Sequence, residues 1–111
     1  IGGTHISTLP STITPEMDLA VIGEGEQTML EVIKTFIQYG LDMSKMAKIR
    51  GLVFKNKNNK LVFTGDRELI QPLDKIPFPA RDLLRIPIRG QLHLFSSRGC
   101  PYKCTFCQST R

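Results

Sequence analysis

Three cysteines near the carboxyl end are the residues of this chain with the clearest capacity for chemistry. Cys100, Cys104 and Cys107 form the pattern C-x3-C-x2-C within one short segment. Three thiolates at this spacing in a loop can ligate three corners of a 4Fe–4S cluster, and the missing fourth ligand leaves one iron open to a small molecule. Gly99 permits a tight turn before the first cysteine, and Arg98 supplies positive charge that compensates the thiolates.

Other uses of the three cysteines remain open at this point. A zinc site usually adds a second pair of ligands to its first, and no later pair follows here. A catalytic thiol needs one cysteine with a histidine nearby. An odd number of cysteines in a single cluster argues against a disulfide framework. We therefore expect a reduced metal site and a cytoplasmic protein.

Composition and charge limit the class of protein. The chain is 41% hydrophobic and 23% charged, which is typical of a globular protein. No apolar run reaches the roughly 18–20 residues that span a bilayer, so we expect no membrane span. Residues 1–44 contain six acidic side chains and one basic one, whereas residues 45–111 contain fourteen basic and four acidic ones. The basic half admits a nucleic-acid partner, but the few aromatic residues (7%, no Trp) make that partner the weaker expectation.

The amino-terminal part predicts a strand, a glycine turn and a helix. The apolar run 19–22 ends at glycines, which favours a central parallel strand. Residues 26–39 predict an amphipathic helix that ends at Gly40. Strand, turn and helix in this order form half of a βαβ unit. The helix would carry an apolar stripe made of Met29, Leu30, Ile33, Phe36 and Ile37.

The rest of the chain predicts a hairpin, a linker and one more strand. Residues 51–55 and 60–64 are β-prone and flank an Asn- and Lys-rich turn. Four prolines interrupt residues 66–89, where only Asp82–Leu84 suits a helical turn. Residues 91–95 alternate as in a strand and lead into the cysteine segment.

The cysteine segment resembles a known family. Ser96-Ser-Arg-Gly-Cys-Pro-Tyr-Lys-Cys-Thr-Phe-Cys107 is similar to the cluster loop after the first barrel strand of radical S-adenosylmethionine enzymes. The resemblance implies that Cys100, Cys104 and Cys107 ligate the cluster, that S-adenosylmethionine occupies the open iron, and that Phe106 lies near the adenine. It also implies a small-molecule substrate and an electron donor such as flavodoxin or ferredoxin.

Two glycine motifs extend the resemblance over almost the whole chain. Each follows an expected strand end, where open α/β sheets bind ligands. The order of glycine turn, second glycine turn, hairpin, Ile76-Pro-Phe-Pro-Ala-Arg-Asp82 and cysteine loop resembles the cobalamin-binding subgroup of radical S-adenosylmethionine proteins. The resemblance implies that the cobalamin pocket is lined by Gly2, Gly3, Thr4, His5, Gly23, Glu24 and Gly25.

The resemblance implies an α/β fold in three parts. Residues 1–65 would be the carboxyl-terminal part of a Rossmann-like cobalamin-binding domain with a β-hairpin, and residues 66–89 a proline-rich linker. Residues 90–111 would be the first strand and cluster loop of a truncated (β/α) radical S-adenosylmethionine barrel. His5 lacks an Asp two residues before it, so we expect a pocket or loop histidine rather than a cobalt ligand. Neither end resembles a natural terminus, and we expect this piece alone to be inactive.

Three functions follow from these patterns. The leading hypothesis is a radical S-adenosylmethionine enzyme with a 4Fe–4S cluster and a cobalamin, acting in methyl transfer or a related C–C bond-forming or cyclising reaction. The second keeps the radical chemistry without cobalamin, as in an RNA methylthiotransferase. The third is a zinc-stabilised nucleic-acid-binding module. The residues that would determine the substrate are expected after Arg111, so no catalytic residue is assigned.

Overall fold

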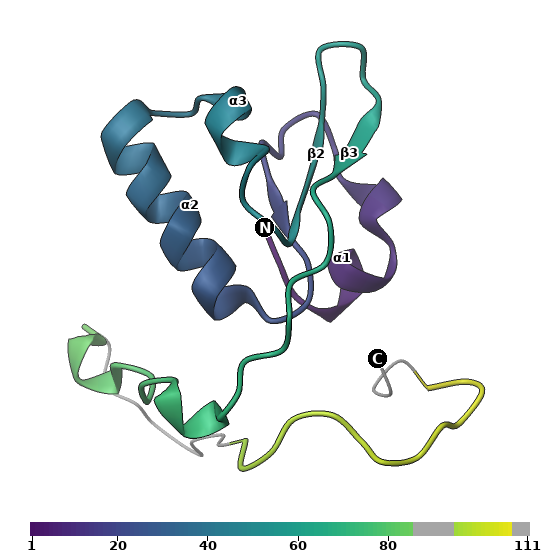
Figure 1. The fold of residues 1–111 in the computed structure, drawn as a ribbon, viewed down its shortest axis with the longest axis vertical. Coiled ribbons are helices and arrows are strands. Elements are labelled where there is room, and N and C mark those ends of the chain that lie inside the picture. The colour runs from purple at the N-terminus through teal and green to yellow at the C-terminus, as the bar shows by residue number, and fades with distance from the viewer. Residues whose placement is uncertain (86–94, 108–111) are drawn as a thin grey trace. The chain divides into compact units, whose positions relative to one another are not determined.

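The computed structural model describes residues 1–85 and 95–107, and the chain divides into two compact units, Ile1–Ile70 and Gln71–Arg111 (Figure 1). The first unit has a small sheet with helices on both of its faces. Its elements are α1 (Thr4–Thr8), the 3₁₀ helix η1 (Pro10–Thr12), β1 (Ala20–Val21), α2 (Gly25–Tyr39), α3 (Met43–Met46), β2 (Leu52–Lys55) and β3 (Leu61–Phe63).

The sheet has the order β1-β2-β3, and both assigned pairs are antiparallel. β1 pairs with β2 so that Ala20 lies opposite Val53. β2 pairs with β3 through the hairpin, with Phe54 opposite Val62. The predicted hairpin is therefore confirmed. Its turn is held by the Asn56 side chain, whose Oδ1 accepts hydrogen bonds from the Asn58 and Lys60 amides.

Ile1 lies along the other edge of β1. Its nitrogen donates to the Leu19 carbonyl at 3.0 Å, and its carbonyl accepts from the Val21 amide at 2.8 Å. Two bonds from one residue that flank Ala20 in this way have the pattern of a parallel pair. In the assigned sheet, however, β1 is an edge strand with an antiparallel partner, so the prediction of a central parallel strand is wrong. The parallel bonding described here comes from Ile1.

The predicted strand, turn and helix are present, but the prediction that they form half of a βαβ unit is wrong. The strand after α2 runs antiparallel to β1, whereas a βαβ unit needs parallel strands. A helix alone would return the chain to the amino end of β1. Here α3 and the residues after it carry the chain back to the carboxyl end of β1, where the Ile22 amide donates to the Gly51 carbonyl at 2.8 Å. β2 therefore starts beside the end of β1 and runs in the opposite direction.

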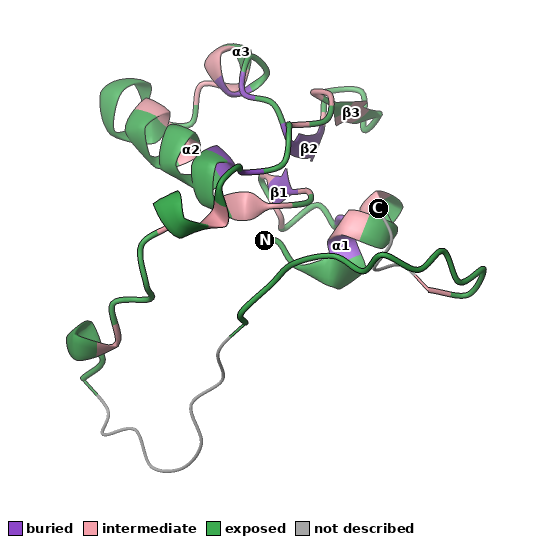
Figure 2. Ribbon diagram, turned by 60° about the horizontal axis from the view of Figure 1, so that its bottom comes forward, coloured by how far each residue is buried: buried purple, intermediate pink, exposed green. Residues whose placement is uncertain are grey.

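The core of the first unit has two parts. On one face of the sheet, Ile6 of α1 and Ile13 pack against Ala20 and Val53. Val21 and Leu52 belong to the second cluster, which is completed by Met46, Ile49 and the partly buried Leu19 and Val32. Alternate residues of a strand point to opposite faces, so each strand contributes to both clusters. Figure 2 shows these buried positions on β1, β2, α1 and α3.

Helix α2 forms where the apolar periodicity predicts it and ends at Gly40, as expected. It meets the rest of the unit through the fully buried Thr28, whose hydroxyl donates to the Arg50 carbonyl at 3.2 Å, and through Val32. The predicted apolar stripe is not in the core: its side chains are 46–79% exposed, and Figure 2 shows most of α2 as exposed. Periodicity identifies which residues share a face, whereas packing decides which face is buried.

The second unit has less regular structure in its described residues. It contains the 3₁₀ helices η2 (Leu73–Lys75) and η3 (Arg81–Leu83), and η3 overlaps the predicted helical turn at Asp82–Leu84. The strand predicted at 91–95, with His93, falls on residues outside the described range except for Phe95. Among the residues that the structure describes, no helix is long and apolar enough to cross a membrane.

Candidate functional site

The two glycine turns lie at the same edge of the sheet. Gly2 and Gly3 directly follow Ile1, and Gly23 to Gly25 follow β1. Because Ile1 and β1 are bonded in the parallel manner, both turns leave the carboxyl ends of neighbouring strand segments. Crevices at this edge are where open α/β sheets bind ligands. The structure therefore brings the two predicted motifs together.

Gly3 and Gly23 have backbones that other residues rarely adopt. Their φ angles are 103° and 72°, and a Cβ built on either would have no neighbouring heavy atom within 4 Å. The outer side of both turns is therefore open, and a flat ligand could approach the backbone closely there.

Ser7 connects the two turns. Its hydroxyl donates to the Gly3 carbonyl at 2.9 Å and accepts from the Gly23 amide at 3.0 Å. The motif search did not single out this serine, because nothing in the sequence places it beside Gly23. Its position four residues after Gly3, on the first turn of a helix, is the one local signal, since serine often bonds the carbonyl at that spacing.

Thr4 and His5 lie on α1 and are exposed. The Thr4 carbonyl accepts from the Thr8 hydroxyl, and the His5 carbonyl accepts from the Leu9 amide. The backbone carbonyls of Thr4 and His5 are therefore both used in local hydrogen bonds of α1 and its carboxyl end.

Glu24 has a structural partner that the sequence did not reveal. Its carboxylate accepts a hydrogen bond from the Ile70 amide at 2.7 Å. In the same stretch, Arg67 forms a 2.7 Å ion pair with Glu31 and also bonds Gln27. Residues 66–70, counted with the linker in the sequence, thus lie along the first turns of α2 and against one of the glycine turns.

The cysteine loop holds two exposed cysteines and one that is half-buried. Cys100 and Cys104 are exposed, Cys107 is half-buried, and none of the three forms a disulfide. The Cys107 amide donates to the Cys104 carbonyl at 3.1 Å, which closes a tight turn between two of the predicted ligands. Soft thiolates suit iron–sulfur chemistry. The side chain of Phe106 is 92% exposed.

No group of three or more His, Cys, Asp or Glu side chains in the described residues is gathered closely enough to hold a metal ion. The three sulfurs therefore stand apart in the described loop, and the case for a cluster rests on thiolate chemistry and on the spacing of the cysteines in the sequence. Metal sites of this kind are commonly assembled by the metal itself.

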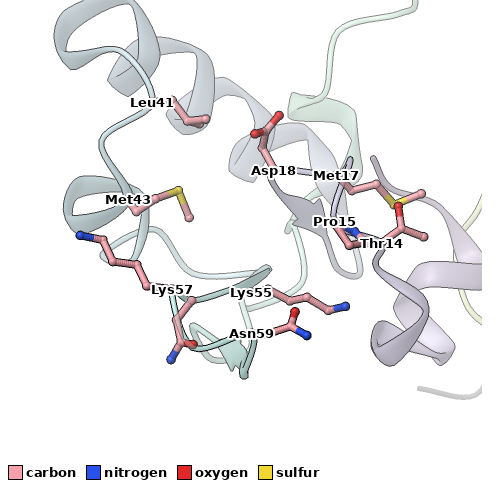
Figure 3. A pocket seen from close by; sticks show the side chains of 10 residues that line it. Thr14, Pro15, Met17, Asp18, Leu41, Met43, Lys55, Lys57 and Asn59 are labelled. Carbon is pink, nitrogen blue, oxygen red and sulfur yellow. The ribbon is translucent and has the colours of Figure 1, made fainter.

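A cavity of about 390 Å³ lies at the opposite end of the sheet from the glycine turns (Figure 3). In Figure 3 the side chains of Lys55 and Lys57 point away from one another, and Met43 lies on the same side as Lys57. None of the sequence-predicted site residues lines this cavity. Its lining comprises Thr14, Pro15, Met17, Asp18, Leu41, Met43, Lys55, Asn56, Lys57 and Asn59.

Two carboxyl groups near this end of the sheet have a pKa below the ordinary value. The Thr14 hydroxyl bonds Glu16 and lowers the pKa of its carboxyl, and the charge of Lys55 acts in the same direction. The Ser44 hydroxyl and amide bond the Asp42 carboxylate and lower its pKa. Both shifts are explained by local hydrogen bonds in turns, so neither indicates an acid–base catalyst.

Comparison with known proteins relates the chain to enzymes. The chain is 34% identical, over 99% of its length, to an uncharacterized methyltransferase of Pyrococcus horikoshii. It is 31% identical, over 96% of its length, to the anaerobic magnesium-protoporphyrin IX monomethyl ester cyclase of Rubrivivax gelatinosus, and 28% identical to the cyclase of the same name from Synechocystis. No family model and no solved structure matches the chain.

The chain spans only part of these relatives. It covers 25% of the methyltransferase and 21% and 19% of the two cyclases. The alignment with the methyltransferase extends over 99% of the 111 residues, so it spans both the glycine turns and the cysteine loop. The sequence relationship is thus to enzymes.

Proposed function

We propose that this chain is part of a radical S-adenosylmethionine enzyme that also binds a cobalamin. Residues 1–65 would be the carboxyl-terminal part of the cobalamin domain, and residues 90–111 would begin the radical S-adenosylmethionine domain. The reaction would be methyl transfer or a C–C bond-forming cyclisation. A methyltransferase and a cyclase among the relatives support these two classes of reaction.

One observation carries the proposal. This chain contains both the C-x3-C-x2-C segment and the paired glycine turns, and nearly its whole length aligns with a methyltransferase and a cyclase. The turns lie together at the carboxyl edge of the sheet, with an open surface at Gly3 and Gly23. Either motif alone has ordinary structural explanations, and their combination favours an enzyme with two cofactors.

The predicted site residues would have separate binding roles. Cys100, Cys104 and Cys107 would ligate three irons, and Phe106 would offer an exposed ring to the adenine. If bound, the cluster would pass one electron from a donor such as flavodoxin or ferredoxin to S-adenosylmethionine, which would supply methionine and a 5′-deoxyadenosyl radical for hydrogen abstraction. Gly3 and Gly23 would let the backbone approach the corrin ring.

Metal analysis tests the cluster. We expect protein reconstituted with iron and sulfide without oxygen to hold about four irons and a similar amount of sulfide per chain. One zinc without sulfide would reject the cluster and favour the zinc-stabilised nucleic-acid-binding module.

Absorbance titration with hydroxocobalamin tests the corrinoid. We expect saturable binding with a shift of the corrinoid bands. An intact cluster without any corrinoid binding would reject cobalamin and favour the cobalamin-independent radical enzyme.

A further inference from the structure

The hydrogen bonds between the segment that starts at Ile1 and the β1 segment form a short series. Ile1 donates to Leu19 and accepts from Val21, as described above. If the parallel pattern continued, the next bond of this type would join the Gly23 amide to the Gly3 carbonyl. The structure has a different arrangement at this point.

The Ser7 hydroxyl stands between the two groups. It donates to the Gly3 carbonyl at 2.9 Å and accepts from the Gly23 amide at 3.0 Å. A hydroxyl has one proton to donate and lone pairs to accept with, so it can satisfy both groups at once. The direct bond is replaced by a bridge through one oxygen atom, which holds the two glycine turns further apart.

We propose that Ser7 is a positioning residue that sets the separation of the two glycine turns, and thereby the width of the surface that receives the corrinoid. The inference rests on the proposed function for the identity of the ligand. The bridge itself rests on Ser7, Gly3 and Gly23 alone. Ser7 acts through the turns and is not assigned a contact with the ligand.

The neighbouring Thr8 separates this role from an ordinary helix contact. Its hydroxyl donates to the Thr4 carbonyl at 2.8 Å, which is the same four-residue bond that Ser7 makes to Gly3. Ser7 additionally accepts from the Gly23 amide of the second turn, 16 residues away in sequence. Thr8→Ala is therefore a matched control that removes a hydroxyl from α1 and leaves the bridge intact.

The test combines two measurements on the whole protein that contains this chain. The first is hydrogen exchange at the Gly23 amide without ligand, and the second is the affinity for hydroxocobalamin by absorbance titration. In Ser7→Ala we expect exchange at Gly23 to be about three- to tenfold faster and the affinity to be about three- to tenfold weaker, as loss of one hydrogen bond allows. Ser7→Thr keeps a hydroxyl and should restore both values, and Thr8→Ala should match the wild type in both.

The Ser7 bridge and its role in positioning the turns can be rejected separately. Unchanged Gly23 exchange in Ser7→Ala would overturn the bridge. Faster exchange with unchanged hydroxocobalamin affinity would overturn the positioning role. If the wild type bound no hydroxocobalamin, the proposed corrinoid function and the positioning role would both be rejected, while the exchange data would still decide on the bridge.

Discussion

The glycine turns and the cysteine loop are supported in different ways. The turns belong to a unit whose sheet is covered on both faces, and all the buried apolar side chains of the described residues lie in Ile1–Ile70. In the cysteine loop, Phe95 is 88% and Phe106 92% exposed. A packed core therefore prepares the first candidate site, whereas the second has ligands but little packing of its own.

Because of this difference, the two candidate sites would form in different ways. Preorganised turns can bind a ligand without much ordering, while a metal site with exposed ligands gains its order from the metal. Substitutions in one region should then leave the other region unaffected.

Loss of a single cysteine should have the largest effect. Replacement of Cys100, Cys104 or Cys107 by Ser should lower the bound iron at least about tenfold after reconstitution, because three thiolates are the full protein ligand set of the proposed cluster. Iron and sulfide analysis with visible absorbance measures the loss. Thr105→Ala, in the same loop, should retain the iron. Full iron content in any one of the three variants would contradict the assignment of that cysteine.

A core substitution in the sheet should destabilise only the first unit. Leu52 is fully buried, and Leu52→Ala should lower the free energy of unfolding by about 2–5 kcal/mol through lost burial and a cavity. Urea unfolding followed by circular dichroism measures this change. Leu61→Ala, on the neighbouring strand and 44% exposed, should cost much less. If Leu52→Ala also abolished iron binding, the two regions would not be independent.

The contacts of residues 66–70 should contribute a smaller amount. Arg67→Ala removes the ion pair with Glu31 and the bond to Gln27, and we expect a loss of about 0.5–1.5 kcal/mol in unfolding free energy. Hydrogen exchange should also accelerate at the Ile70 amide, which bonds Glu24 nearby. The exposed Arg50 provides the control Arg50→Ala, and equal effects of both variants would indicate a general charge effect.

The smallest effect should come from Asp42 and should depend on pH. Ser44 lowers the pKa of this carboxyl below its ordinary value of 3.8, so the carboxylate adds stability above that pH and loses it as the pH falls through the lowered pKa. The unfolding midpoint of Asp42→Asn should thus be lower than that of the wild type near neutral pH and converge with it in acid. Ser44→Ala should reduce the difference, and a gap that persists in acid would contradict this origin.

Several elements were predictable because their signals are local. The apolar period of α2 and its glycine stop, and the β-prone segments around the Asn56 turn, depend on residues close in sequence. The position of both glycine turns after strand segments was also predictable. The antiparallel direction of β2 was not, because it depends on where α3 carries the chain. The exposure of the apolar stripe of α2 was not predictable for a similar reason. Thr28 and Val32, rather than the stripe, pack the helix against the rest of the unit.

The sequence by itself determined the candidate chemistry: three cysteines at a cluster spacing, two glycine turns, and their order along the chain. Residue type and spacing are sufficient for this, because ligand chemistry and turn propensity are local properties. Only the tertiary structure decided that the turns share one edge, that Ser7 bridges them, and that Glu24 bonds Ile70. These features join residues 16 and 46 positions apart, and such contacts arise from packing and hydrogen-bond satisfaction across the whole unit.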